Sequence, residues 1–164
     1  MINLEDKKNI VLSLNDHFVY AGEQSLKLRN KGLIETIKSD NTPVTNGDLE
    51  VNKIITNKIK KLTSEIPIVS EESSLNKENR SLNTFWLVDP IDGTYDYIHN
   101  KDEFTINAAL IIDKKPELGI IYAPAKKRLF YTYGKNMSFE KTKNKEKILN
   151  FKKITKEGVV KAVS

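Results

Sequence analysis

The amino-acid sequence predicts an α+β fold in which two helices are followed by a largely antiparallel sheet. Up to Leu62 the apolar residues recur at steps of three and four, as one face of a helix requires. From Ile66 onward the apolar runs are short, rich in β-branched and aromatic residues, and separated by turn residues, which is typical of strands. The turn-forming segment from Asp113 to Pro116 lies between two of these runs. It predicts a hairpin, and therefore antiparallel pairing.

Two helices are predicted in the first part of the chain. The first lies between Asn3 and Leu28, and the second runs from about Asp48 to Leu62. Between them, Ser39 to Pro43 has the composition of a turn, and Thr45 to Asp48 resembles a helix-capping arrangement. The apolar residues that define the first helix are Leu4, Val11, Leu14, Phe18, Ala21 and Leu28.

The rest of the chain is predicted to build the sheet. The expected strands are Ile66 to Val69, Phe85 to Val88, Thr105 to Ile112, Leu118 to Tyr122 and Leu129 to Tyr133. The segment from Gly158 to Ser164 has the pattern of a strand that begins and stops, so we expect residues 1–164 to be one incomplete domain.

Composition limits the classes of function. The chain has 164 residues, 38% of them hydrophobic, which is enough for one globular core. It has no cysteine, which excludes disulfides, thiolate metal sites and thiol nucleophiles. The net charge of +5 comes from basic residues that are scattered and mostly lysine, so nucleic-acid binding is not expected. The densest basic run, Lys141 to Lys147, is predicted to be a solvated hairpin or loop.

The segment from Phe85 to Thr94 is the most informative for chemistry. An apolar strand delivers two carboxylates, Asp89 and Asp92, around a stiff Pro90 and a Gly93 that lets the backbone approach a ligand. Neighbouring carboxylates repel each other, whereas a divalent cation would turn that repulsion into attraction. Oxygen ligands favour Mg²⁺, Mn²⁺ or Ca²⁺ over zinc. Ordinary turn formation is the alternative interpretation of this segment.

Two further acidic positions support the metal interpretation. Glu71 and Glu72 follow another short apolar strand, and Asp48 stands at the start of the second helix. Each has a simpler explanation, since the glutamates could be a solvated pair and Asp48 a helix cap. The histidines, His17 and His99, are interpreted as incidental polar residues.

Together these motifs resemble the lithium-sensitive, Mg²⁺-dependent inositol monophosphatase superfamily. The resemblance begins with Lys38 to Thr45 and Asp48, passes through Glu71-Glu72, and reaches the segment from Trp86 to Thr94. It implies an inositol-monophosphatase/sugar-phosphatase-like layered α/β sandwich. This chain would supply the N-terminal portion of that sandwich, and the C-terminal α/β half would be missing.

Downstream of these motifs, the segments from Glu103 to Ile111 and from Gly119 to Pro124 are more similar to the 3'(2'),5'-bisphosphate nucleotidases of CysQ type than to inositol monophosphatases. The chain departs from that branch in two places. Gly47 stands where the family usually has alanine, a mild change. Tyr95 stands where the nucleotidases often have lysine, which bears on substrate preference.

The resemblance implies the metal ligands. Glu71, Asp89 and the carbonyl of Ile91 would bind a first Mg²⁺, and Asp89 and Asp92 would bind a second, with Mn²⁺ as a substitute. Asp89 would bridge the two ions. The part of the family that supplies a further ligand to the second metal lies beyond this sequence, so we expect the 164 residues alone to have little or no activity.

The resemblance also implies the catalytic and substrate-binding residues. Asp48 and Thr94 would orient and deprotonate the attacking water, and the backbone of Gly93 and Thr94 would hold a phosphate oxygen. The residues expected to contact substrate are Glu71, Ile91, Asp92, Gly93 and Thr94.

The expected function is therefore Mg²⁺-dependent, two-metal hydrolysis of the 3'-phosphate of adenosine 3',5'-bisphosphate or its sulfated precursor. Inositol monophosphatase activity is the alternative within the class. A non-catalytic remnant that binds metal or a partner weakly is the alternative of another class. The expected partner is a small phosphate ester, without nucleic acid or a membrane span, and a homo-oligomer stays open. The expected location is cytoplasmic, with peripheral association with the inner membrane face left open.

Overall fold

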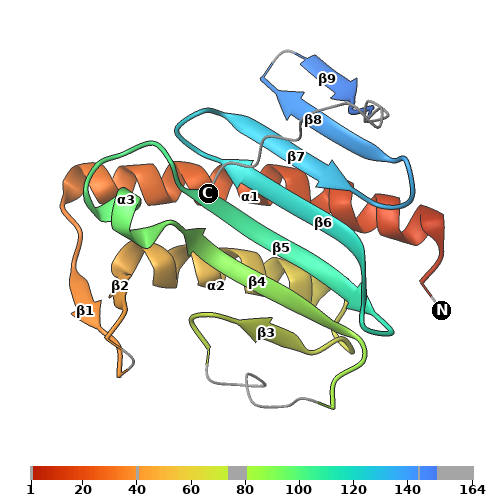
Figure 1. Cartoon of the computed structure of the whole chain (residues 1–164), viewed down its shortest axis with the longest axis horizontal. Helices are drawn as coiled ribbons and strands as arrows, with labels where there is room; N and C mark the ends of the chain where they lie inside the picture. The colour runs from red at the N-terminus through yellow and green to blue at the C-terminus, as the bar shows by residue number, and fades with distance from the viewer. Residues whose placement is uncertain (1, 40, 74–80, 144, 151–164) are drawn as a thin grey trace, which may run out of the picture.

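The structure is a computed structural model that describes residues 2–39, 41–73, 81–143 and 145–150. It contains two long helices, one short helix, a two-stranded hairpin and a seven-stranded sheet (Figure 1). The strand expected from Gly158 to Ser164 lies outside the described residues.

The helix expected first is α1, Leu4–Lys31. Asn3 caps it in a reciprocal capping box with Asp6, in which each side chain accepts a hydrogen bond from the other residue's backbone N–H at 2.9 Å. The helix continues to Lys31, past the expected end at Leu28, and Gly32 follows at a φ of 100°. The prediction of this helix is confirmed.

A short hairpin separates the two long helices. Strands β1, Glu35–Ile37, and β2, Pro43–Thr45, pair antiparallel. The sequence predicted only a turn from Ser39 to Pro43, and the flanking strands were missed because each has three residues, too few for a periodic pattern to stand out. Pro43 is the first residue of β2, a strand position that proline tolerates.

The second helix is α2, Asn46–Leu62, which begins two residues before the predicted start at Asp48. Its cap is the predicted Thr45 to Asp48 arrangement. The Thr45 hydroxyl accepts hydrogen bonds from the backbone N–H groups of Gly47 and Asp48, at 3.1 and 3.4 Å. The Asp48 carboxylate in turn accepts from the Thr45 backbone N–H at 2.8 Å.

The seven strands of the main sheet follow chain order from β3 to β9. Strand β3 runs parallel to β4, and every later pair is antiparallel, as predicted. The strands are β3 (Ile68–Ser70), β4 (Phe85–Asp92), β5 (Thr105–Ile112), β6 (Lys115–Ala123), β7 (Arg128–Thr132), β8 (Ser138–Thr142) and β9 (Lys145–Ile148).

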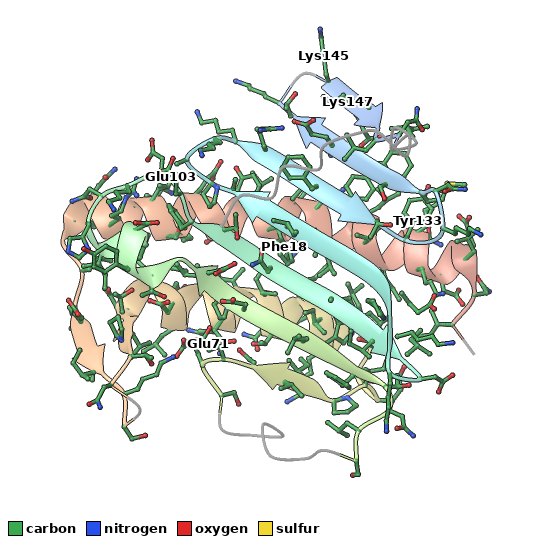
Figure 2. All side chains as sticks on the ribbon, in the orientation of Figure 1. Phe18, Glu71, Glu103, Tyr133, Lys145 and Lys147 are labelled. Atoms are coloured by element: carbon green, nitrogen blue, oxygen red, sulfur yellow. The ribbon has the colours of Figure 1, made fainter. Side chains whose placement is uncertain are left out.

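The predicted hairpins and strands are mostly confirmed. Asp113 and Lys114 adopt positive φ values of 50° and 62° in the tight turn between β5 and β6. Most of the basic run from Lys141 to Lys147 lies in the paired strands β8 and β9, and all four residues of β9 are exposed. Figure 2 shows Lys145 and Lys147 on this outermost strand. Strand β3 begins at Ile68, two residues after the prediction, and β4 continues four residues past the predicted end at Val88.

The long helices cover one face of the sheet, and the core lies between the two layers (Figure 1). Trp86 on β4 is fully buried there, and its indole N–H donates to the Thr63 hydroxyl at 3.0 Å. No described helix or strand packs on the opposite face of the sheet. Neither long helix has a stretch, among the described residues, that is long and apolar enough to cross a membrane. The most deeply buried side chains include Phe18, Leu14, Ile55, Ile59, Tyr97, Phe104, Ile106 and Leu110.

Candidate metal centre

An irregularity in β4 places its two carboxylates on one face of the sheet. Side chains alternate between faces along a strand, so residues three apart, such as Asp89 and Asp92, would normally point in opposite directions. The register of β4 against β5 shifts by one residue between them. Pro90 and Ile91 are consecutive buried residues, as expected of a β-bulge. Asp89 and Asp92 therefore both lie on the face that the helices leave uncovered.

Glu71 joins these carboxylates from the neighbouring strand. Strand β3 pairs with β4 through Ser70 and Val88, and the next backbone N–H, that of Glu71, donates to the Val88 carbonyl at 3.1 Å. Ser70 is buried toward the helices, so Glu71 takes the opposite face. Figure 2 shows Glu71 at the end of β3, beside β4. The acid that sequence analysis singled out thus lies next to Asp89.

The pKa of Asp89 reflects its burial and the acids around it. Burial raises the pKa of the Asp89 carboxyl, and the negative charges of Glu71 and Asp92, a hydrogen bond with Glu71 and the charge of Asp48 raise it further, to about 7. One oxygen of this carboxyl, Oδ1, is buried and has no hydrogen-bond partner. A buried carboxylate oxygen without a partner is costly unless a cation or proton donor satisfies it.

The hairpin supplies a counter-charge to both glutamates. The Lys38 ammonium lies 2.7 Å from Oε1 of Glu72 and 3.4 Å from Oε1 of Glu71. Burial raises the pKa of Glu72, and the ammonium of Lys38 partly offsets this effect. Lys38 thus forms ion pairs with both glutamates, the shorter one with Glu72, so the two are not simply a solvated pair.

Asp48 is the helix cap that the sequence offered as the simpler explanation, and it also contacts Thr94. Its Oδ2 accepts hydrogen bonds from the backbone N–H and hydroxyl of Thr45, as a capping residue should. Its Oδ1 accepts from the Thr94 hydroxyl at 3.3 Å. Asp48 as a residue is 1% exposed. Burial raises the pKa of its carboxyl, and the hydrogen bonds from Thr45 and Thr94 partly offset this effect. Asp48 is therefore a cap with one oxygen turned toward Thr94.

The turn after β4 holds Thr94 in place. The Thr94 hydroxyl lies 3.0 Å from the Ile91 carbonyl oxygen, an acceptor that has two lone pairs. Gly93 has a φ of 92°, and a Cβ there would lie 3.0 Å from the Glu103 carbonyl oxygen. Glycine is thus required at this position. It directly precedes the short helix α3, Thr94–Ile98.

Gly47 is explained by its contact with Tyr97. A Cβ on Gly47 would lie 2.8 Å from Cε1 and 2.9 Å from Cζ of the Tyr97 ring, and its contact with the hydroxyl oxygen would be closer still. That hydroxyl donates to the Ser25 carbonyl at 2.7 Å, which fixes the ring. The departure from alanine at this position therefore has a packing reason.

Two neighbours of the acids had no role assigned from the sequence. Lys38 contacts Glu72 from the β1–β2 hairpin, and Asn107 on β5 donates from Nδ2 to Oδ2 of Asp92 at 3.1 Å. Both contacts join residues far apart in the chain. Only the folded register of the strands reveals them.

The donor set fits a hard divalent cation better than a zinc ion, because it consists of carboxylates and a carbonyl without histidine or cysteine. The unpartnered Oδ1 of Asp89 also fits a missing positive charge. In the part of the chain that the structure describes, no three His, Cys, Asp or Glu side chains are already arranged around a common metal position. The acids are thus neighbours that would have to turn toward an ion.

Comparison with known proteins identifies the family. The sequence model of the inositol monophosphatase family matches residues 14–163. The chain belongs to the inositol monophosphatase family. The expected superfamily and its α+β fold are thereby confirmed.

Within the family, the chain is similar to proteins named CysQ. It is 45% identical over 107 residues to the 3'(2'),5'-bisphosphate nucleotidase CysQ of Buchnera aphidicola, an alignment that covers 63% of this chain and 40% of that protein. The crystal structure of CysQ from Bacteroides thetaiotaomicron matches with a TM-score of 0.68 and 29% identity, over 96% of this chain and 55% of that one.

A more distant structure of the family is an inositol monophosphatase/NADP phosphatase complexed with Mg²⁺ and phosphate. It matches with a TM-score of 0.68 over 84% of this chain and 51% of that one, and its 21% identity makes this a likeness of fold. The chain thus spans about half the length of the relatives it matches.

Proposed function

We propose that this chain carries the metal-binding portion of a Mg²⁺-dependent phosphomonoester hydrolase. The observation that supports this most is the β4 bulge, which turns Asp89 and Asp92 to one face beside Glu71 and leaves Oδ1 of Asp89 without a partner. Lys38 pairs with Glu71 at 3.4 Å, but this one ammonium, which also pairs with Glu72, does not neutralise the whole set of acids. A set that repels itself is what a cation site requires.

Four residues would hold the ions. Glu71, Asp89 and the Ile91 carbonyl would form the first position, and Asp89 and Asp92 the second. Bound divalent ions would supply charge neutralisation for an in-line phosphoryl transfer and stabilise the leaving oxygen. Mg²⁺ is the expected ion, and Mn²⁺ the substitute.

Asp48 and Thr94 would orient the attacking water and deprotonate it. The Thr94 hydroxyl lies within reach of Asp48 Oδ1, and burial raises the pKa of Asp48, which makes it a better proton acceptor than an exposed aspartate. The water oxygen would bond to phosphorus as the ester P–O bond breaks, and the released alkoxide would take up a proton. The backbone of Gly93 and Thr94 would bind a phosphate oxygen.

The substrate we propose is the 3'-phosphate of adenosine 3',5'-bisphosphate or its sulfated precursor. The support is the 45% identity to a protein named as a 3'(2'),5'-bisphosphate nucleotidase. Inositol monophosphatase activity is the second candidate, since the family model itself carries that description.

Phosphate release tests this proposal. The samples are the 164-residue chain and a chimera in which the remaining half of the Buchnera aphidicola relative follows it. With Mg²⁺, the chimera should release phosphate faster from adenosine 3',5'-bisphosphate than from inositol 1-phosphate, and lithium should inhibit it. We expect little release from the 164 residues alone, because the substrate contacts and ligands of the other half are absent.

The outcomes separate the alternatives. A preference for inositol 1-phosphate would favour the second candidate. A folded chimera with no Mg²⁺-dependent release from either ester would favour a remnant that only binds metal or a partner. Turnover of ~1 to 10³ per second by the 164 residues alone would mean that the site is complete without the other half.

A further inference from the structure

Asn107 occupies a distinctive position beside the proposed metal centre. It is the cross-strand partner of Asp89 in the β4–β5 ladder, so its side chain lies on the same uncovered face as the carboxylates. Its Nδ2 donates to Oδ2 of Asp92 at 3.1 Å. Its Oδ1 is buried and has no hydrogen-bond partner. One amide thus touches a proposed ligand and adjoins another.

The orientation of the amide follows from its neighbour. An ionised carboxylate only accepts hydrogen bonds, so the group that meets Asp92 must be the NH₂ end of Asn107. An aspartate in place of Asn107 would add one more negative charge to a group of carboxylates that already repel one another. An aliphatic residue would leave Asp92, which is exposed, free to rotate toward water.

We infer that Asn107 is a positioning residue of the metal centre, which holds the Asp92 carboxylate in a fixed orientation without adding charge. This inference rests on the proposed function, because Asp92 must be a metal ligand for its orientation to matter. Partners that orient ligating carboxylates typically change metal affinity by 10-fold to 100-fold when removed. Asn107 would act through Asp92 and not on the substrate.

The test measures Mn²⁺ affinity of the 164-residue chain by calorimetry, which needs no enzymatic turnover. Asn107→Leu has a similar size but no amide, and it should weaken Mn²⁺ binding ~10-fold or more. Asn107→Gln keeps the amide and should recover a large part of the affinity. Thr105→Val is the matched control, because it changes a residue directly across from Asp92 without removing the Asn107 amide. This substitution is expected to leave the Mn²⁺ affinity unchanged.

A purely structural role would give a different result. We expect the metal-free thermal midpoint of Asn107→Leu to stay close to that of the unaltered chain, while affinity falls. If this variant does not fold, Asn107→Ala is judged by the same comparison. Equal Mn²⁺ affinity in the unaltered chain and the folded amide-free variant would overturn the inference and leave the proposed function standing. Failure of the unaltered chain to bind Mn²⁺ would overturn both.

Discussion

At the scale of single residues, Gly47 and Tyr97 are a packed pair near the start of α2. Gly47→Ala would push a methyl group into the buried Tyr97 ring, and we expect it to destabilise the chain by about 1–3 kcal/mol despite the better helix propensity of alanine. Urea denaturation measures the change. Adding Tyr97→Phe removes the hydroxyl, the atom in closest contact, and should restore part of the loss. A neutral or stabilising Gly47→Ala would contradict this packing account.

The raised pKa of Asp89 predicts that the stability of the metal-free chain depends on pH. Its carboxyl binds a proton more tightly in the folded chain, with a pKa of about 7, than in the unfolded chain, where it is near 4. Stability from this group is therefore fully present below pH ~4 and is lost as the pH rises toward 7. Asp89→Asn cannot ionise and lacks this dependence.

The measurement compares thermal midpoints of the two chains in chelator at pH 5 and pH 8. Relative to Asp89→Asn, the unaltered chain should lose stability between these values. Taking the difference cancels the other titrating groups, such as His17, whose pKa burial lowers. If the difference in thermal midpoint between the two chains is the same at pH 5 and pH 8, the neighbouring acids do not raise the pKa of Asp89.

At the scale of elements, the cap of α2 supports both the fold and the proposed site. Thr45→Ala removes a hydroxyl that accepts hydrogen bonds from the backbone N–H groups of Gly47 and Asp48 and donates one to the Asp48 carboxylate. We expect a loss of about 0.5–2 kcal/mol in the free energy of unfolding. Thr56→Ala, in the middle of the same helix, is the control. It loses only a bond to the Asn52 carbonyl and should be near neutral, so equal losses would argue against the cap.

The elements also show what the sequence could and could not predict. Helices α1 and α2 and strands β4 to β7 were predictable because they are long enough to carry a periodic pattern. The β-bulge in β4 could not be predicted, because no local sequence pattern marks Pro90 and Ile91 as the place where the strand carries an extra residue. The motif at Asp89 and Asp92 was recognised from its residues, but its shared face depends on pairing with β5, which is non-local.

The contacts of Lys38 and Asn107 were unpredictable for the same reason. Lys38 comes from a hairpin whose strands are too short to recognise, and it reaches Glu72 across 34 positions of sequence. Asn107 meets Asp92 only because β4 and β5 pair in one particular register. The position of Glu71 was easier to predict, because an acid that directly follows a strand in the sequence must lie at the end of that strand.

At the scale of the whole molecule, the uncovered sheet face is apolar. Leu87 and Ile121 are 48% and 45% exposed there, and with Phe130 and Phe139 they line a hollow of about 490 Å³ that extends to Asp89. Exposed apolar surface of this kind favours association. We therefore expect the 164-residue chain to self-associate as its concentration rises.

Sedimentation velocity measures this association. Ile121→Lys places a charge in the hollow and should shift the chain toward monomer. Leu12→Lys is the matched control, since Leu12 is similarly exposed, at 41%, but lies on α1. A chain that stays monomeric as its concentration rises, or equal effects of both substitutions, would contradict association through this face.

Metal binding tests the central claim most directly. Calorimetric titration of the 164-residue chain with Mg²⁺ and Mn²⁺ should show heat of binding, and millimolar metal should raise the thermal midpoint. Asp89→Asn should abolish both effects, because Asp89 would contact both ions. Asp96→Asn removes a carboxylate that pairs with Lys101 nearby and should leave both effects intact. No heat and no midpoint shift in the unaltered chain, or equal loss in the two variants, would contradict a metal centre built on Glu71, Asp89 and Asp92.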